Sequence, residues 1–414
     1  MTRTVRLSAF SFGLSVVIVT AGASLMAQDW PQFLGPERNG QYDGPALARR
    51  WPGGAPPELW RRSVGAGFAG PVVVNARLLL FHRIGGEEVL EAFDAATGEP
   101  LWRYAYETTY RDDFGFDEGP RSSPVVADGR VFTFGAQGQL HAVDLESGDG
   151  LWSVDARARF RFSKAFFGAA GSPLVEDGRV LANIGGLDAG IVAFDASSGD
   201  VLWTATEEEA SYSSPVAATF GGVRHALFFT RDNFVALDPA TGRVRFQRSW
   251  RARIRSSVNA ATPLVIGEKV FISAQYGTGA GVFRVSGLAL QELWTSDDAL
   301  SNHYATSVYH DGYLYGYHGR QEYGPSLRAV ALDSGHVAWD TESFGAGSVT
   351  VAGNLLLIMR ESGELVLAEA SPDGFAPVLS ATLLPPVVRA YPAIAAGRFF
   401  VRNGDTLLAV DLNP

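Results

Sequence analysis

The sequence of 414 residues contains no cysteine. Without cysteine, the chain cannot form disulfide bonds or carry a lipid on an N-terminal cysteine, so an exported form depends on core packing alone. Hydrophobic residues make up 46% of the chain, with 26 Phe and 9 Trp, which is enough apolar material for a large core. The 47 glycines and 21 prolines indicate many turns without low-complexity sequence.

Recognisable metal-binding and catalytic motifs are also missing from the sequence. The seven histidines include no His-x-x-His or His-x-x-x-His pair, and neither a Gly-x-Ser-x-Gly motif nor a phosphate loop occurs. Asp112, Asp113 and Asp117 lie close together, but their spacing lacks the glycine and the distal glutamate of a calcium loop. We therefore predict no metal site and expect these aspartates to form a solvated acidic loop.

Long apolar runs are absent after the first residues of the chain. Arg3 and Arg6 precede an uncharged apolar stretch over residues 7–26, which predicts a signal peptide over residues 1–27, cleaved after Ala27 or after Ala23. An uncleaved membrane anchor is the alternative. We expect the protein to be periplasmic or extracellular, not a lipoprotein, and without an integral membrane span once the signal is removed.

Negative charge exceeds positive charge, with a formal net charge of -10 at pH 7. This excess argues against nucleic acid and anionic membrane surfaces as partners, because both repel an acidic protein. Solubility alone also explains the excess, so we assign no acidic function to it.

A repeated unit runs through most of the chain. In its clearest copy, residues 123–152, short apolar runs are separated by turns such as Asp128-Gly129, and the last run contains Trp152. Short strands with Asp-Gly and Ser-Gly turns predict a four-stranded antiparallel meander. The copy beginning at Pro263 lacks the Asp-x-x-x-Gly turn, and the copy over residues 347–383 has no Trp.

The spacing of these units predicts an all-β fold, an eight-bladed β-propeller. The aromatic residues that end successive units lie 42 to 51 residues apart, at Trp60, Trp102, Trp152, Trp203, Phe246, Trp294 and Trp339. That period is typical of propeller blades. Each Trp is expected to pack between adjacent blades, and each turn aspartate to accept turn hydrogen bonds.

The two ends of the repeat region predict how the ring closes. Residues 392–411 supply three strands, and residues 57–60 supply the missing fourth strand, which would remove both open sheet edges. We therefore predict a propeller over residues 58–414 and an N-terminal arm over residues 28–57 that packs across it. We expect a monomer.

The repeat resembles that of quinoprotein-type propellers, which are related to dehydrogenases that use pyrroloquinoline quinone (PQQ). The similarity lies in the pattern Ala-Val-Asp-x-x-Ser-Gly-x-x-x-Trp at residues 142–152 and covers residues 60–411. Residues 29–36, Asp-Trp-Pro-Gln-Phe-Leu-Gly-Pro, also resemble the opening of secreted PQQ-like repeat proteins. The resemblance implies either a dehydrogenase with PQQ and calcium or a non-catalytic lipoprotein that assists outer-membrane protein assembly.

The chain departs from both of these types. Many alcohol-oxidising enzymes of the family carry adjacent cysteines beside the cofactor, and the assembly lipoprotein carries a lipid on a cysteine, whereas this chain has no cysteine and no long insertions. Fold alone does not choose between the two types.

The meander geometry predicts which face of the ring carries function. Loops between the second and third strands share one face with the loops between blades, and this face holds the irregular segments. We therefore expect a cationic and aromatic mouth of a central funnel on this face. The candidate ligand-binding residues are Arg121, Lys164, Arg255, Asn302, His303, Tyr304, Arg320, Gln321, Glu322 and Arg389.

The sixth blade carries the most distinctive of these residues, since the repeat does not require a polar cluster there. His303 and Glu322 are weak candidates for a catalytic acid–base pair, and Arg320 for a bidentate contact to a carboxylate or phosphate. A buried hydrogen-bond network that fills the channel explains the same residues without any ligand.

We expect a non-catalytic binding or scaffold module that takes a protein segment or a small anionic ligand on the loop face. No cofactor is predicted for that function. The alternative is a PQQ-dependent dehydrogenase, with PQQ and calcium, that oxidises an alcohol or a sugar.

Overall fold

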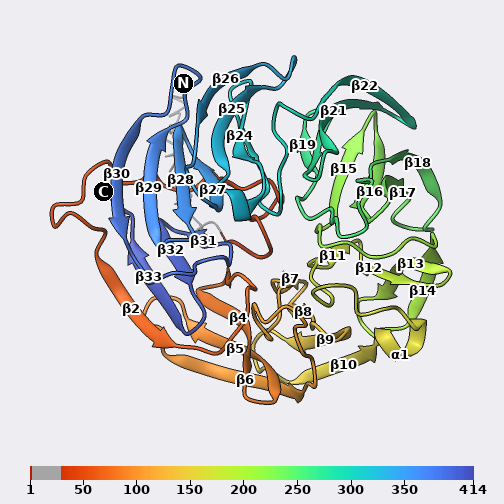
Figure 1. Ribbon diagram of the computed structural model, residues 1–414. Coiled ribbons are helices and arrows are strands. Elements are labelled where there is room, and N and C mark those ends of the chain that lie inside the picture. Colours follow the sequence, from red (N-terminus) through yellow and green to blue (C-terminus); the bar gives the residue numbers. More distant parts are fainter. Residues whose placement is uncertain (2–28) are drawn as a thin grey trace.

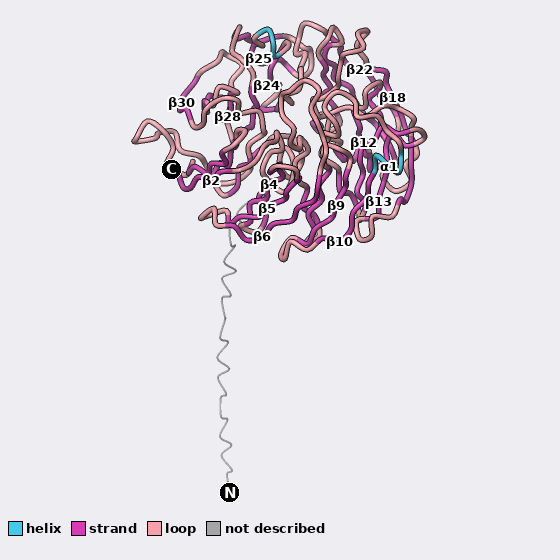
Figure 2. Tube along the Cα trace, turned by 60° about the horizontal axis from the view of Figure 1, so that its bottom comes forward, coloured by secondary structure: helices cyan, strands magenta, loops and turns pink. Residues whose placement is uncertain are grey.

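The computed structural model describes Met1 and residues 29–414, so most of the predicted signal peptide lies outside the described residues. The described residues form eight small sheets arranged in a ring, which confirms the predicted eight-bladed propeller (Figure 1). Nearly all of the regular structure is strand, apart from two short helices, α1 (Ala156–Phe160) and the 3-10 helix η1 (Gln321–Tyr323) (Figure 2).

Blades 1 to 4 follow one another along the chain, each ordered from the inner to the outer strand. Blade 1 contains β3 (Val72–Val74), β4 (Arg77–Ile84), β5 (Glu87–Asp94) and β6 (Pro100–Glu107). Blade 2 contains β7 (Val125–Ala127), β8 (Arg130–Phe134), β9 (Gln139–Asp144) and β10 (Gly150–Asp155). Blade 3 contains β11 (Leu174–Glu176), β12 (Arg179–Gly186), β13 (Ala189–Asp195) and β14 (Val201–Ala205). Blade 4 contains β15 (Val216–Phe220), β16 (Val223–Phe229), β17 (Asn233–Leu237) and β18 (Val244–Ser249).

Blades 5 to 8 complete the ring. Blade 5 contains β19 (Leu264–Ile266), β20 (Lys269–Ala274), β21 (Gly279–Ser286) and β22 (Ala289–Ser296). Blade 6 contains β23 (Val308–His310), β24 (Tyr313–His318), β25 (Ser326–Ala331) and β26 (Val337–Thr341). Blade 7 contains β27 (Gly347–Ala352), β28 (Leu355–Arg360), β29 (Glu364–Glu369) and β30 (Pro377–Thr382), with β1 (Gln41–Tyr42) added inside. Blade 8 contains β31 (Ala393–Ala395), β32 (Arg398–Arg402), β33 (Thr406–Asp411) and β2 (Glu58–Ser63).

The N-terminal strand closes the ring as predicted. Strand β2 pairs antiparallel with β33, with Trp60 opposite Ala409 and Ser63 opposite Thr406. The outer strand of blade 8 therefore comes from the start of the propeller sequence and its other three strands from the end. This pairing covers the edge of β33 that would otherwise be open to another chain.

A repeated contact of tryptophan joins neighbouring blades. The indole of Trp60, in blade 8, donates to the carbonyl oxygen of Ala95 in the outer turn of blade 1, at 3.1 Å. Its ring covers Gly98, whose φ is 72° and where a Cβ would lie 2.6 Å from the ring. The Asp94 carboxylate accepts the backbone N–H groups of Ala96 and Thr97 and shapes this turn.

The same contact recurs from blade to blade with few exceptions. The bonds run from Trp102 to Leu145, Trp152 to Ala196, Trp203 to Pro239, Trp294 to Leu332 and Trp339 to Ser371. Phe246 replaces the Trp in blade 4, and blade 5, which follows it, lacks the Asp-x-x-x-Gly turn. In blade 7, Leu379 stands where most other blades have the Trp. In blade 8, which follows it, β33 and β2 are not joined by the chain, so the outer turn that would accept the indole hydrogen bond does not form.

The first part of the N-terminal arm runs along the inner strands of the ring, and its later residues, such as Ala48 and Arg49, pack against blades 7 and 8. Trp30 exchanges two backbone hydrogen bonds with Val73 of the inner strand β3, at 2.8 and 2.9 Å. The ring of Phe33 meets Tyr391 edge-on at 4.8 Å, and β1 then pairs parallel with β27. The red N-terminal segment reaches the middle of the ring in Figure 1. The first part of the arm therefore lies against inner strands of the ring.

Replacing Trp60 tests the contact between blades. We expect Trp60→Ala to lower the free energy of unfolding by about 3–5 kcal/mol, because a large buried ring is lost and a cavity remains. Trp60→Phe keeps most of the packing but loses the bond to Ala95, for a cost of about 1–2 kcal/mol. Leu59→Ala is the matched control, since Leu59 is 38% exposed. Urea unfolding measures all three variants, and equal midpoints for Trp60→Ala and Leu59→Ala would contradict the argument.

Candidate functional site

A pocket of about 250 Å³ opens at the centre of the face formed by the interblade loops and the loops between second and third strands. We call this face the funnel face and this cavity the funnel pocket. Aromatic side chains form most of its wall, namely Phe33, Phe68, Phe116, Phe167, Tyr212, Tyr276, Tyr304 and Tyr391. The charged and polar side chains are Arg121, His303, Gln321, Glu322 and Arg389, with Ser172 and Ser214 beside them.

The N-terminal arm supplies Phe33 to the funnel pocket, next to Tyr391. Tyr391 accepts the backbone N–H of Thr306 at 2.5 Å, and burial raises the pKa of its hydroxyl to about 12. Arg38, also on the arm, is buried and donates to carbonyl oxygens of Ser172, Pro173 and Pro215. Burial lowers the pKa of Arg38 to about 9. These contacts fasten the arm to the inner ends of blades 3 and 4.

Arg389 and Glu361 form an ion pair on one side of the pocket. Arg389 Nε donates to Glu361 Oε1 at 2.6 Å, and its guanidinium lies 5.0 Å from the ring centre of Phe68. Glu361 also accepts from the Tyr304 hydroxyl and from Gln321 Nε2. Burial, together with the charge of Glu361, raises the pKa of Tyr304 well above its usual value. The carboxylate thus joins blades 6, 7 and 8 across the funnel.

His303 lies on the blade 6 side of the pocket in a neutral state. Its Nε2 lies 2.7 Å from the Tyr276 hydroxyl, and its Nδ1 accepts the backbone N–H of Gln321 at 3.4 Å. Burial lowers the pKa of His303, so the ring carries no charge at neutral pH. Glu322 Oε2 is 3.9 Å from Nδ1 and is held by Arg320, which lowers its pKa. The residues predicted as an acid–base pair therefore share no hydrogen bond.

Arg121, whose guanidinium lies 5.5 Å from the ring centre of Phe68, is also paired. Its guanidinium lies 3.3 Å from Asp112 and 5.3 Å from the ring centre of Phe167. Asp112 accepts the backbone N–H groups of Phe116 and Asp117, so its carboxylate shapes the loop that presents Phe116. The sequence predicted that Asp112, Asp113 and Asp117 form a solvated acidic loop, whereas the Asp112 carboxylate is buried and bonded to its own loop.

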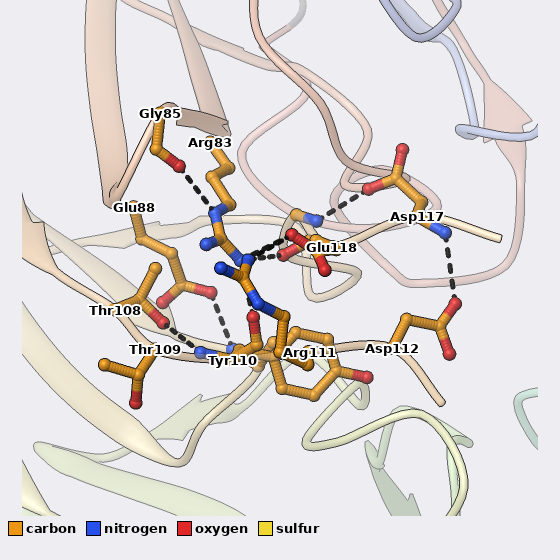
Figure 3. A network of polar contacts seen from close by, with 12 residues as sticks. Arg83, Gly85, Glu88, Thr108, Thr109, Tyr110, Arg111, Asp112, Asp117 and Glu118 are labelled. Atoms are coloured by element: carbon orange, nitrogen blue, oxygen red, sulfur yellow. Dashed lines mark hydrogen bonds and ion pairs between the residues drawn. The ribbon is translucent and has the colours of Figure 1, made fainter. Parts of the chain in front are cut away.

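Arg83 of strand β4 fastens the same loop from the side of blade 1. Its guanidinium donates to the carbonyl oxygens of Tyr110 and Glu118 at 2.7 and 3.0 Å, as Figure 3 shows. Its Nε donates to the carbonyl oxygen of Gly85. Glu88 lies buried beside this network, and burial raises its pKa. The loop is therefore held in place by hydrogen bonds from β4 rather than by packing alone.

The structure brings six of the ten candidate residues together in the funnel pocket: Arg121, His303, Tyr304, Gln321, Glu322 and Arg389. Lys164 pairs with Asp113 outside the pocket, and Arg320 lies over the ring of Tyr276. Asn302 is buried and donates to the carbonyl oxygen of Tyr317 at 2.8 Å. Arg255 lines a neighbouring pocket.

A family model described as outer membrane protein assembly factor BamB matches residues 85–322, more than half of the chain. The chain belongs to this PQQ-like propeller family. BamB from Moraxella catarrhalis has a similar fold, with a TM-score of 0.64 at 14% identity over 86% of this chain and 97% of that one. The quinohemoprotein alcohol dehydrogenase from Comamonas testosteroni gives a TM-score of 0.63 at 14% identity, over 92% and 80%.

The curated relatives of this PQQ-like chain are longer enzymes. Quinohemoprotein alcohol dehydrogenase ADH-IIG of Pseudomonas putida is 30% identical over 140 residues, which are 33% of this chain and 19% of that protein. The aligned part of this chain thus spans less than a fifth of that relative. The similarity establishes the propeller but does not assign the activity.

Sequence reasoning missed several residues of the funnel pocket and its rim, among them Phe33, Phe68, Phe116, Tyr276 and Glu361. Glu361 and Tyr276 lie in loops between the second and third strands of their blades. Residues 320–322 were selected because they lie in such a loop, so the same reasoning could have found Glu361 and Tyr276. Phe33 had no such signal, because the sequence does not show that the arm enters the channel. None of the helices formed by residues 29–414 has the length and hydrophobicity needed to cross a bilayer.

The ion pair between Arg389 and Glu361 can be tested by a double substitution. We expect Glu361→Ala to lower the free energy of unfolding by about 2–3 kcal/mol, because Arg389, whose side chain is 20% exposed, loses its carboxylate. Glu361→Ala/Arg389→Met should recover part of this loss, since no unpaired charge remains. Urea unfolding measures both, and a double variant less stable than Glu361→Ala would contradict the pairing.

Proposed function

We propose that this chain is a non-catalytic protein-binding module that inserts an apolar side chain of a partner segment into the funnel pocket. The observation that carries the proposal is the combination of aromatic walls with charges that are already paired. Arg389 is paired with Glu361, Arg121 with Asp112 and Glu322 with Arg320. A free anion would have to displace one of these carboxylates, whereas an apolar group meets open aromatic surface.

Exposed apolar side chains around the mouth support a protein partner. The exposed fractions are 53% for Phe114, 59% for Phe116, 78% for Tyr323 and 47% for Val387. Exposed apolar residues gathered around a pocket are typical of protein interfaces, in which aromatic anchors contribute most of the affinity. The family description, an assembly factor for outer membrane proteins, agrees with a binding role. We place this role outside the cytoplasm, as the predicted signal peptide implies.

The second candidate is a quinone-dependent dehydrogenase, which the similarity to quinohemoprotein alcohol dehydrogenases favours. PQQ bound through calcium needs six to eight oxygen ligands for the ion. Glu361 already accepts from Tyr304, Gln321 and Arg389. Across residues 29–414, no group of three or more His, Asp or Glu side chains converges as a metal site. The donor set of the funnel pocket therefore does not fit a calcium-assembled quinone.

Selection of displayed peptides tests the protein-binding proposal. We expect peptides selected on the immobilised protein to share an aromatic or large aliphatic residue, and Phe116→Ser to weaken their binding about tenfold or more, because an interface anchor contributes roughly 2 kcal/mol. Leu288→Ser is the matched control, since Leu288 is 54% exposed in a turn on the opposite face. Fluorescence anisotropy with labelled peptides gives the affinities.

Two outcomes would overturn the proposal. In the first, the selected peptides bind Phe116→Ser as tightly as the unchanged protein and lose affinity for Leu288→Ser. In the second, the purified protein incubated with PQQ and calcium acquires the quinone absorbance and reduces a dye with an alcohol or a sugar. The second result would favour the dehydrogenase.

A further inference from the structure

A second pocket lies beside the funnel pocket on the funnel face and has a different chemistry. Its volume is about 460 Å³, and three arginines line it: Arg231, Arg251 and Arg255. The remaining lining residues are Ser163, Ala165, Phe166, Ile184, Gly185, Glu209 and Ala210. We call this cavity the arginine pocket. It lies between the loops of blades 2, 3 and 4.

Arg231 is the most buried of the three arginines, with an exposed fraction of 9%. Its guanidinium donates to the carbonyl oxygen of Arg255 and lies 5.3 Å from the ring centre of Phe166. Its buried Nε forms an ion pair with Glu209 Oε2 at 3.0 Å. The guanidinium of Arg231 is thus held by one carbonyl oxygen and one carboxylate, and its charge adds to the positive potential of the pocket.

The other charges at the arginine pocket leave an excess of positive charge. Arg251 is paired with Asp232, which does not line the pocket. Arg255 has no carboxylate within 4 Å among residues 29–414. Glu209, which lies against Arg231, has a side chain that is 64% exposed and can turn toward solvent. Three guanidinium groups thus face two carboxylates, one of them weakly held.

A wall of aromatic residues separates the arginine pocket from the funnel pocket. Phe166 lines the first and Phe167 the second, and the backbone N–H groups of both donate to the Tyr212 hydroxyl at 3.0 Å. The two pockets are therefore adjacent but distinct. A ligand in one does not occupy the other.

We propose that the arginine pocket binds a phosphomonoester on a small molecule. Arg231 and Arg255 hold the phosphate oxygens, and an apolar group of the ligand lies against Phe166 and Ile184. The planar guanidinium matches two phosphate oxygens at once, and a dianion gains more than a carboxylate from several cations. This site is independent of the apolar anchor proposed for the funnel pocket.

Isothermal titration at low salt tests the proposal with phenyl phosphate, inorganic phosphate and benzoate as probes. We expect phenyl phosphate to bind at one site, more tightly than inorganic phosphate, because its ring contacts Phe166 and Ile184. Benzoate should bind more weakly than either, because it has a single negative charge. Affinity should fall as sodium chloride is added, since part of it is electrostatic.

Three substitutions locate the site. Arg255→Gln should weaken phenyl phosphate binding about 10- to 100-fold, the loss expected for a charge-assisted hydrogen bond. Glu209→Gln should strengthen it several-fold, because the carboxylate that competes for Arg231 is removed. The control, Arg253→Gln, changes an exposed arginine of the same loop that does not line the pocket and should leave the affinity within about twofold.

Several outcomes would overturn the proposal. One is the absence of phenyl phosphate binding to the unchanged protein, and another is benzoate binding as tightly as phenyl phosphate. A third is Arg255→Gln binding normally while Arg389→Gln, in the funnel pocket, abolishes binding. Because Arg255 and Glu209 are exposed, neither substitution should unfold the chain, and matching melting temperatures would verify this. The peptide experiments on Phe116 do not affect these results.

Discussion

The indole N–H of a tryptophan in one blade, bonded to a turn carbonyl of the next blade, is the contact on which the ring depends. It joins neighbouring blades, and in most copies a glycine stands beneath the indole ring, as Gly98 does beneath Trp60. Phe246 and Leu379 replace the tryptophan in blades 4 and 7, whereas Trp294 and Trp339 keep the bond although the turns they contact lack the Asp-x-x-x-Gly pattern.

A closed ring of blades leaves a channel at its centre, and the first part of the N-terminal arm lies along its inner strands. Trp30 pairs with the inner strand β3, and Arg38 fastens the arm to carbonyl oxygens of blades 3 and 4. Phe33 of the arm consequently lines the funnel pocket. The loops around the funnel pocket take no part in closing the ring, and they present aromatic side chains to solvent.

The two pockets on the funnel face differ in how their charges are balanced. In the funnel pocket, Arg389 and Arg121 each have a carboxylate partner, so the open surface is mainly aromatic. In the arginine pocket, Arg255 has no such partner among the described residues. The first arrangement favours an apolar anchor and the second an oxyanion, although both sites are built on loops between neighbouring blades.

The sequence by itself determined the propeller, its eight blades and its closure, because the signals are local: Asp-Gly turns, a Trp or Phe every 42 to 51 residues and an unmatched strand at each end. It also indicated the funnel face and placed His303 beside Gln321, since both lie in loops of one blade. Only the tertiary structure decided that Phe33 enters the channel and that Glu361, from blade 7, pairs with Arg389 of the loop before blade 8. Contacts between blades depend on distances around the ring, which no local pattern in the chain encodes.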